Sequence, residues 1–194
     1  MVSVVARPRL NIAVIIGSTR EGRFCPTVAG WFVTQARGRS DMTIDVLDLA
    51  EVALPSIYPR RASADVEAYL GRLGRADGFV VVTPEYNHGY PASLKQAIDL
   101  AYVEWRAKPV AFVSYGGMAG GLRAVEQLRQ VFAELHAATV RDTVSFHQAR
   151  AAFDAAGEPR DTTCPAAAAK TMLDQLAWWA AALRAARTDV PYAT

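Results

Sequence analysis

Short apolar runs alternate with segments of helical periodicity along most of this chain. The apolar runs are rich in β-branched and aromatic residues, which is typical of strands that are buried on both faces of a parallel sheet. Five such runs are expected to be strands, at residues 10–16, 43–47, 78–83, 110–115 and 139–144. Apolar positions repeat every three or four residues in the intervening segments. These segments predict helices at about residues 24–37, 64–75, 91–102, 119–136 and 163–187.

Strict alternation of strand and helix predicts the α/β class, with helices on both faces of a parallel sheet. Crossover connections between parallel strands are right-handed, which leaves few arrangements for five strands. We therefore predict a flavodoxin-like three-layer sandwich with a five-stranded parallel sheet in the order 2-1-3-4-5. No internal repeat or long linker divides the sequence, so residues 1–194 are expected to form a single domain.

Composition narrows the classes of protein to consider. Hydrophobic residues make up 52% of the chain, which is enough for a packed core and argues against global disorder. The formal net charge is only +2, so neither nucleic acid nor an anionic membrane is expected as a partner. No apolar run is long enough to span a bilayer, and the N-terminal residues do not resemble a signal peptide. We expect a cytoplasmic protein.

The loop after the first strand has the chemistry of a phosphate site. Residues 17–23 read Gly-Ser-Thr-Arg-Glu-Gly-Arg and lie between a strand and a helix. This arrangement brings backbone N–H groups, hydroxyls, arginines and the positive end of a helix dipole together. Both Gly-x-x-x-x-Gly-Lys and Gly-x-Gly-x-x-Gly are missing, which leaves a site for one phosphomonoester, most commonly flavin mononucleotide (FMN). The alternative is a polar turn with solvated arginines.

Two further loops follow strands at the same expected edge of the sheet. Residues 83–91 read Thr-Pro-Glu-Tyr-Asn-His-Gly-Tyr-Pro, a rigid turn whose backbone could pair with the polar rim of a flat aromatic ligand. It could equally be a structural turn whose aromatic rings cover the end of the sheet. Residues 114–121 read Ser-Tyr-Gly-Gly-Met-Ala-Gly-Gly, and four glycines in six positions permit a close backbone approach. A mobile hinge or an elaborate helix start is the alternative there.

The sequence offers no obvious catalytic or metal-binding group. The three histidines lack the spacing of metal ligands, so no metal site is expected. Cys25 and Cys164 lie far apart and make no metal or redox pair. No carboxylates form a recognisable acid–base pair, so no catalytic residue is assigned.

Four segments together resemble the NADPH-dependent FMN reductase family, whose members include chromate- and quinone-reducing flavoproteins. They are Gly-Ser-Thr-Arg at 17–20, Pro-Glu-Tyr-Asn at 84–87, Ser-Leu-Lys-Gln-Ala-Ile-Asp at 93–99 and Ser-Tyr-Gly-Gly at 114–117. The match runs in order from about residue 10 to residue 144. The resemblance implies a flavodoxin-like fold, non-covalent FMN and a homodimer or homotetramer.

The resemblance also assigns cofactor-binding roles to particular residues. Ser18, Arg20 and Arg23 would hold the FMN phosphate. Backbone groups of Pro84, Glu85, Tyr86 and Asn87 would line one edge of the isoalloxazine ring, and Ser114, Gly116 and Gly117 would approach its pyrimidine end. Many members carry serine and asparagine where this chain has Arg23 and Cys25. Arg23 can supply charge instead, whereas a thiol is a weak hydrogen-bond donor.

The function that the resemblance implies is NAD(P)H-dependent reduction of bound FMN, with NADPH or NADH as co-substrate. A small-molecule acceptor would then be reduced, such as a quinone, a flavin, an azo compound or a metal oxyanion. The flavin supplies the chemistry, which accounts for the lack of a catalytic residue. The alternative is an FMN-containing electron-transfer protein of the flavodoxin type. Such carriers are usually strongly acidic, and a net charge of +2 argues against one. A flavin-free binding module is a third possibility.

Overall fold

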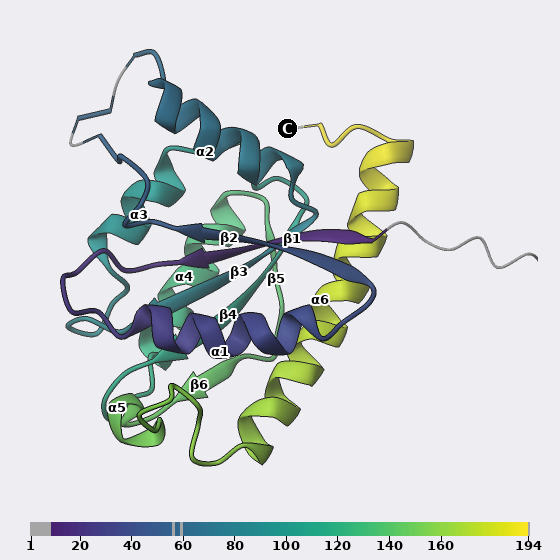
Figure 1. Ribbon diagram of the computed structural model, residues 1–194. Coiled ribbons are helices and arrows are strands. Elements are labelled where there is room, and N and C mark those ends of the chain that lie inside the picture. Colours follow the sequence, from purple (N-terminus) through teal and green to yellow (C-terminus); the bar gives the residue numbers. More distant parts are fainter. Residues whose placement is uncertain (1–8, 56, 59, 194) are drawn as a thin grey trace, which may run out of the picture.

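The chain folds around a parallel β-sheet that carries helices on both faces (Figure 1). The computed structural model describes residues 9–55, 57–58 and 60–193. The strands are β1 (Leu10–Ile16), β2 (Met42–Asp48), β3 (Gly78–Pro84), β4 (Pro109–Tyr115), β5 (Ala138–Thr139) and β6 (Val144–Phe146). The helices are α1 (Cys25–Arg37), α2 (Ala64–Arg75), α3 (Ala92–Asp99), α4 (Leu122–Glu134), α5 (Ala149–Ala152) and α6 (Thr163–Asp189). The strand order β2-β1-β3-β4-β5 confirms the predicted order 2-1-3-4-5.

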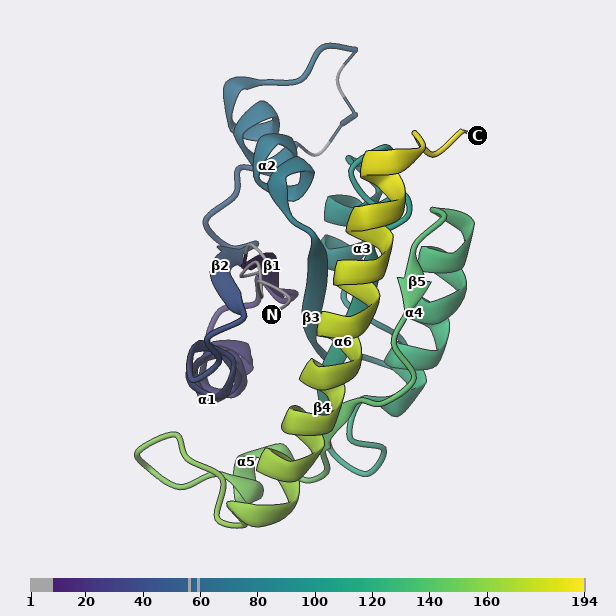
Figure 2. The same cartoon turned by 90° about the vertical axis from the view of Figure 1, so that its right-hand side faces the viewer.

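Two separate hydrophobic cores fill the spaces on either side of the sheet. One lies between the sheet and helices α1 and α6, and the other lies between the sheet and helices α2, α3 and α4. Helix α6 packs against β4 and lies across the sheet in Figure 2. Successive residues of β1 alternate between the two cores, with Ile12 and Val14 in the first and Ala13 and Ile15 in the second. This period of two explains why buried strands read as continuous apolar runs.

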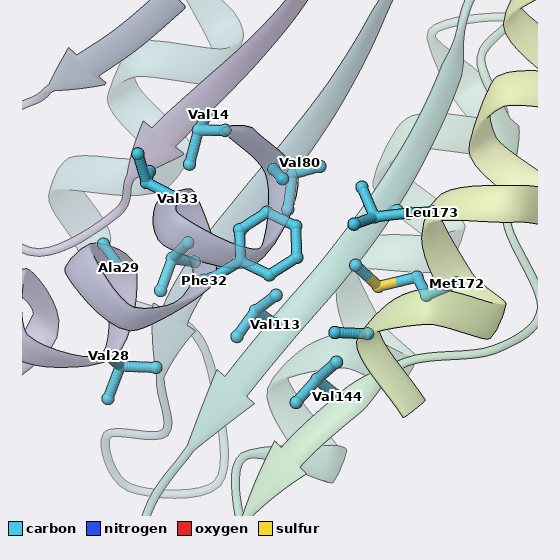
Figure 3. Packing of buried hydrophobic residues seen from close by; sticks show 14 of the residues in the cluster. Val14, Val28, Ala29, Phe32, Val33, Val80, Val113, Val144, Met172 and Leu173 are labelled. Carbon is cyan, nitrogen blue, oxygen red and sulfur yellow. The ribbon is translucent and has the colours of Figure 1, made fainter. Parts of the chain in front are cut away.

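The ring of Phe32 from α1 lies within the first core. Phe32 is completely buried and points toward the sheet and α6 (Figure 3). Around it lie Val80 of β3, Val113 of β4, and Met172 and Leu173 of α6. Residues that are far apart in sequence therefore meet at this ring, so that α1, the sheet and α6 pack as one unit.

None of the described helices is long and apolar enough to cross a membrane.

The prediction of one continuous fifth strand at residues 139–144 is wrong. This part of the chain forms two short strands, β5 and β6, and both pair in parallel with β4. Val110 pairs with Thr139, and Val113 pairs with Val144. The chain opposite β4 thus contains two more residues than β4 does between these two pairs, and a bulge of this kind interrupts the ladder.

The extra residues of this bulge are held by α6. The backbone N–H of Asp142 donates a hydrogen bond to the side-chain oxygen of Gln175 at 3.3 Å, and the Gln175 amide donates to the Asp142 carboxylate. Arg141 points into solvent and pairs with Asp142. Residues 139–144 looked like one strand in the sequence because both ends of the segment are apolar. In the structure, each end belongs to a different strand.

Helix boundaries also differ from the prediction at functional loops. Helix α4 begins at Leu122 rather than near residue 119, because Gly120 and Gly121 adopt left-handed backbone angles with φ of 60° and 86°. Helix α3 ends at Asp99, about one turn early. Helix α5 was not predicted; it is a single turn that follows the left-handed residue Gln148.

Trp105, in the loop before β4, stabilises the end of α3. Its side chain is completely buried, and its indole N–H donates to the carbonyl oxygens of Ile98 and Ala101, each at 3.1 Å. We expect Trp105→Phe to lower the free energy of unfolding by about 1–3 kcal/mol, since the Ala101 carbonyl loses its donor and the Ile98 carbonyl keeps only the Ala101 N–H. Trp178→Phe is the matched control, because Trp178 is 65% exposed, and it should change stability by less than about 0.5 kcal/mol. Urea unfolding followed by circular dichroism measures both; equal losses would contradict the assigned role of Trp105.

Candidate functional site

Three loops meet beyond the carboxyl ends of β1, β3 and β4, as the sequence predicted. Backbone hydrogen bonds connect them: the Gly17 N–H donates to the Val82 oxygen at 2.8 Å, and the Glu85 N–H donates to the Tyr115 oxygen at 3.1 Å. A cleft of about 590 Å³ lies at this edge. Its lining comprises Arg20, Glu21, Gly22, Arg23, Phe24, Pro84, Glu85, Tyr86, Tyr115, Gly116, Gly117, Gln148, Ala149, Arg150 and Ala151.

The loop after β1 holds a buried hydroxyl beside the start of α1. Gly17 lies so close to β3 that a Cβ atom there would be 2.8 Å from the Val82 oxygen, so a side chain cannot be accommodated. The next residue, Ser18, is completely buried, and its Oγ lies near the Cys25 thiol and the Tyr115 phenol without making a hydrogen bond of good geometry to any described residue. A buried polar group without a partner is uncommon and needs an explanation. A bound anion at the N-terminus of α1 would provide the missing partner.

Arg23 is committed to a contact within the protein. Its guanidinium binds both carboxylate oxygens of Asp48 at 2.6 Å and also donates to the Ser18 carbonyl oxygen at 2.6 Å. Burial acts to raise the pKa of Asp48, but the hydrogen bonds from Arg23 and from the Ala50 backbone, together with the Arg23 charge, outweigh it and the net shift is downward. The ion pair joins the end of β2 to the β1 loop and neutralises the Arg23 charge. Phosphate binding by Arg23 stays a prediction. In the structure, this residue links the β1 loop to the end of β2.

Two other arginines stand at the cleft over aromatic rings. The Arg20 guanidinium lies 6.0 Å from the centre of the Tyr86 ring. The Arg150 guanidinium lies 5.4 Å from the centre of the Phe24 ring and donates to the Gly22 oxygen at 3.4 Å. Stacking of this kind restricts a guanidinium without removing its charge. Both side chains are therefore held in place with donors left for an anion.

The loop after β3 forms a tight two-residue turn. Tyr86 and Gly89 exchange backbone hydrogen bonds of 2.8 and 3.0 Å, and Asn87 and His88 between them have φ of 49° and 69°. Two successive left-handed residues are the signature of a type I′ turn, and asparagine suits that conformation. Asn87 is exposed at the tip and does not line the cleft. In the described chain, Asn87 is therefore a turn residue.

The side chain of Glu85 points away from the cleft toward α4. Its carboxylate lies 2.7 Å from Nε of Arg123 and accepts a hydrogen bond from the Arg123 backbone N–H at 3.3 Å. A carboxylate at this position also suits the positive end of the α4 dipole. Residue 85 therefore contributes mainly its backbone to the cleft, and cofactor binding by that backbone stays a prediction.

The glycines after β4 serve two different purposes. A Cβ atom at Gly120 would lie 2.5 Å from Ser145 Oγ, and one at Gly121 would lie 2.7 Å from the Cβ atom of Ser114. These two glycines, both left-handed, are needed for the turn itself. A Cβ atom at Gly117 would meet nothing within 4 Å. The turn does not require a glycine at position 117, and Gly117 therefore leaves space at the wall of the cleft.

Most of the predicted cofactor-binding residues line one cleft. Those that line it are Arg20, Arg23, Pro84, Glu85, Tyr86, Gly116 and Gly117. Ser114 lies beneath the loop, where its hydroxyl donates to the Gly120 oxygen at 2.9 Å. Ser18 is buried behind the β1 loop, and Asn87 lies at the turn tip. Whether each of these residues binds a cofactor stays a prediction.

Part of the cleft wall was not predicted from the sequence. Tyr115, the last residue of β4, lines the cleft, and burial raises the pKa of its phenol. Its position in Ser-Tyr-Gly-Gly at a strand end could have revealed it. Phe24 and residues 148–151 also contribute, and the latter follow a loop with no recognisable motif. In the described part of the chain, no three His, Cys, Asp or Glu residues are placed to hold a metal ion.

The parallel order 2-1-3-4-5, with a polar cleft at the carboxyl ends of β1, β3 and β4, defines a flavodoxin-like protein. The sequence model of the family described as NADPH-dependent FMN reductase matches residues 10–151. The chain belongs to this family.

Individual relatives agree with the family assignment. An NAD(P)H-dependent FMN reductase of Schizosaccharomyces pombe is 40% identical over 130 residues, which cover 62% of this chain and 64% of that protein. A quinone reductase of Escherichia coli is 34% identical over 138 residues, covering 66% and 72%. Among solved structures, the flavoenzyme NAD(P)H:(acceptor) oxidoreductase of Paracoccus denitrificans superposes with a TM-score of 0.72 at 23% identity, covering 89% and 98%, and supports the fold. The matched region thus spans somewhat less than two thirds of the first of these relatives.

The Arg23–Asp48 pair gives a prediction for the pH dependence of stability. Because the pKa of Asp48 is lowered in the folded protein, the pair stabilises fully above the ordinary value of about 3.8 and is lost as pH falls through the lowered value. Asp48→Asn should cost roughly 1.5–3 kcal/mol of unfolding free energy at pH 7, since it removes a charge-assisted hydrogen bond. The difference from the original protein should shrink toward zero below that window. Urea titrations from pH 7 down to acid measure it, and a constant difference would contradict the assignment.

Proposed function

We propose that this chain is an NAD(P)H-dependent FMN reductase, or quinone-reductase-type oxidoreductase, that binds FMN in the cleft at the ends of β1, β3 and β4. The observation that carries the proposal is the buried, unpartnered hydroxyl of Ser18 beside the start of α1. A hydroxyl with no protein partner, at a helix N-terminus and near arginines, fits a phosphate ester. Family membership supports the same ligand.

The cleft residues fit both ends of FMN. At the phosphate end, the Ser18 hydroxyl lies unpartnered behind the β1 loop, and Arg20 is held over Tyr86. At the ring end, Gly117 leaves space that a side chain would fill. A volume of about 590 Å³ lies within the usual range for cofactor sites. Ser114 and Asn87 fit less directly, because both are used in the loops themselves.

FMN held in this cleft would supply the chemistry for hydride transfer from NADPH or NADH and for two-electron reduction of a quinone, a flavin, an azo compound or a metal oxyanion. The protein residues bind, orient and shield. Tyr86, Pro84 and the glycines after β4 form walls that a flat ring can lie against. Cys25 does not act as a nucleophile in this scheme, because burial raises the pKa of its thiol and keeps it protonated.

A flavodoxin-type electron carrier is the second candidate on this fold. Acidic surfaces steer such carriers to basic partners, and the net charge of +2 does not favour that role. The relatives whose names record an activity are reductases, which favours the enzyme.

We also propose a homodimer or homotetramer in a cytoplasmic location, acting on small molecules rather than on nucleic acid or membranes. Exposed apolar side chains such as Met118 and Val103 support self-association. Cys25 is buried and Cys164 is exposed, and both are free thiols, as expected in a reducing compartment. Sedimentation velocity of the FMN-loaded protein tests the assembly.

Steady-state kinetics of the purified protein tests the proposed function. The protein should carry FMN and oxidise NADPH continuously when a benzoquinone is supplied. Because both substrates must reach the same cleft, NAD(P)H should leave before the acceptor enters. Double-reciprocal plots at several acceptor concentrations should then give parallel lines. Flavin without turnover would favour the carrier, and a protein that binds no flavin would contradict both functions.

Gly117→Val should separate cofactor binding from folding. The added side chain enters open space, so the apo-protein should keep its melting temperature to within about 2 °C. The same side chain should occupy ligand space and weaken FMN binding about tenfold or more. Gly74→Val is the matched control, because a Cβ atom at Gly74, near the C-terminus of α2, also meets nothing within 4 Å. Full FMN affinity in the Gly117 variant would place the ring elsewhere.

A further inference from the structure

The charges of the β1 loop are too few for a phosphate ester. A phosphomonoester carries a charge of about −1.5 to −2 at neutral pH. Arg23 is neutralised by its two hydrogen bonds to Asp48, and Glu21 adds a negative charge to the same loop. Among the described residues, Arg20 is then the cation of this loop that has no carboxylate partner. A second cation is needed to match the ligand.

Arg150 brings that second cation from a distant part of the sequence. It belongs to α5, which lies at the same end of the molecule as the start of α1 (Figure 1). Its guanidinium stacks on Phe24, the N-cap residue of α1, and donates to the Gly22 oxygen at 3.4 Å. No ion pair joins it to a carboxylate in the described chain. The charge therefore stands beside the loop that contains Ser18 and Arg20.

The backbone around Arg150 is fixed from both sides. The Gln148 N–H donates to the Gly117 oxygen at 2.9 Å, and the Ala149 N–H donates to the Gly116 oxygen at 3.0 Å. On the other side, the ring of Phe153 packs edge-on against Phe24, with ring centres 5.5 Å apart. The α5 segment thus connects the glycine loop at the ring end of the cleft to the helix start at the phosphate end. A cation held in this way costs little entropy when it binds a ligand.

We propose that Arg150 binds the 5′-phosphate of FMN, so that the phosphate is held between the β1 loop and α5. The inference rests on the proposed function and names a residue outside the motifs that indicated it. The phosphate contact of Arg23 is correspondingly less important, since Asp48 already satisfies that side chain.

Comparison of FMN with riboflavin, which lacks the phosphate, tests this role. Arg150→Met keeps an apolar stem over Phe24 but removes the charge, and Arg150→Lys keeps a charge. In titrations of apo-protein, Arg150→Met should weaken FMN binding about 10- to 100-fold and leave riboflavin binding within about twofold. Arg150→Lys should recover much of the FMN affinity. Arg141→Met is the control, because Arg141 is exposed and lies in the bulge away from the cleft.

The possible outcomes separate the inference from the proposed function. Unchanged FMN affinity in Arg150→Met would overturn the inference while leaving the proposed function intact. Equal weakening of FMN and riboflavin would also overturn it, since Arg150 would then act by packing alone. An original protein that binds neither flavin would contradict the proposed function itself. A loss of FMN affinity that is specific to the phosphate, with rescue by lysine, supports both.

Discussion

The parallel register of three strands is the constraint on which the site depends. Ile16 pairs with Val82, and Pro84 pairs with Tyr115, so β1, β3 and β4 finish close to one level. The Gly17 N–H then continues the ladder by one more hydrogen bond to β3. A slip of the register would reverse the face of every side chain and separate the three loops. The cleft therefore exists because the two cores fix the strands relative to one another. This arrangement does not depend on contacts made by the loop residues.

Charged residues near the cleft divide into those that hold the protein and those that face outward. The pairs Arg23–Asp48 and Glu85–Arg123 join loops to neighbouring elements. Their charges cancel within the protein, so they shape the cleft without adding to its potential. Arg20 and Arg150 instead rest on aromatic rings and keep their charges. A site built in this way is rigid before a ligand arrives, which lowers the entropy cost of binding.

The sequence predicted the fold well because the signals were local. The limits of β1 and α2 match those expected; α2 has a clear start, where the Ser63 hydroxyl accepts a hydrogen bond from the Val66 N–H. The sequence also predicted which loops share an edge, since parallel topology decides that. It could not predict the bulge before β6, which depends on a contact with Gln175 some 33 residues later. Nor could it place Arg150 at the cleft, since tertiary contacts bring α5 there.

The split core has a consequence for synthesis on the ribosome. The core on the α2, α3 and α4 face uses buried residues from Ala13 to Ala137, so it can assemble once roughly two thirds of the chain has emerged. The core on the other face needs Met172, Leu173, Leu176 and Ala180 of α6. Until α6 arrives, α1 and its Phe32 ring have only part of their packing. The nascent protein thus leaves one face of the sheet incompletely covered until the last helix is made, and this is the surface that chaperones would meet.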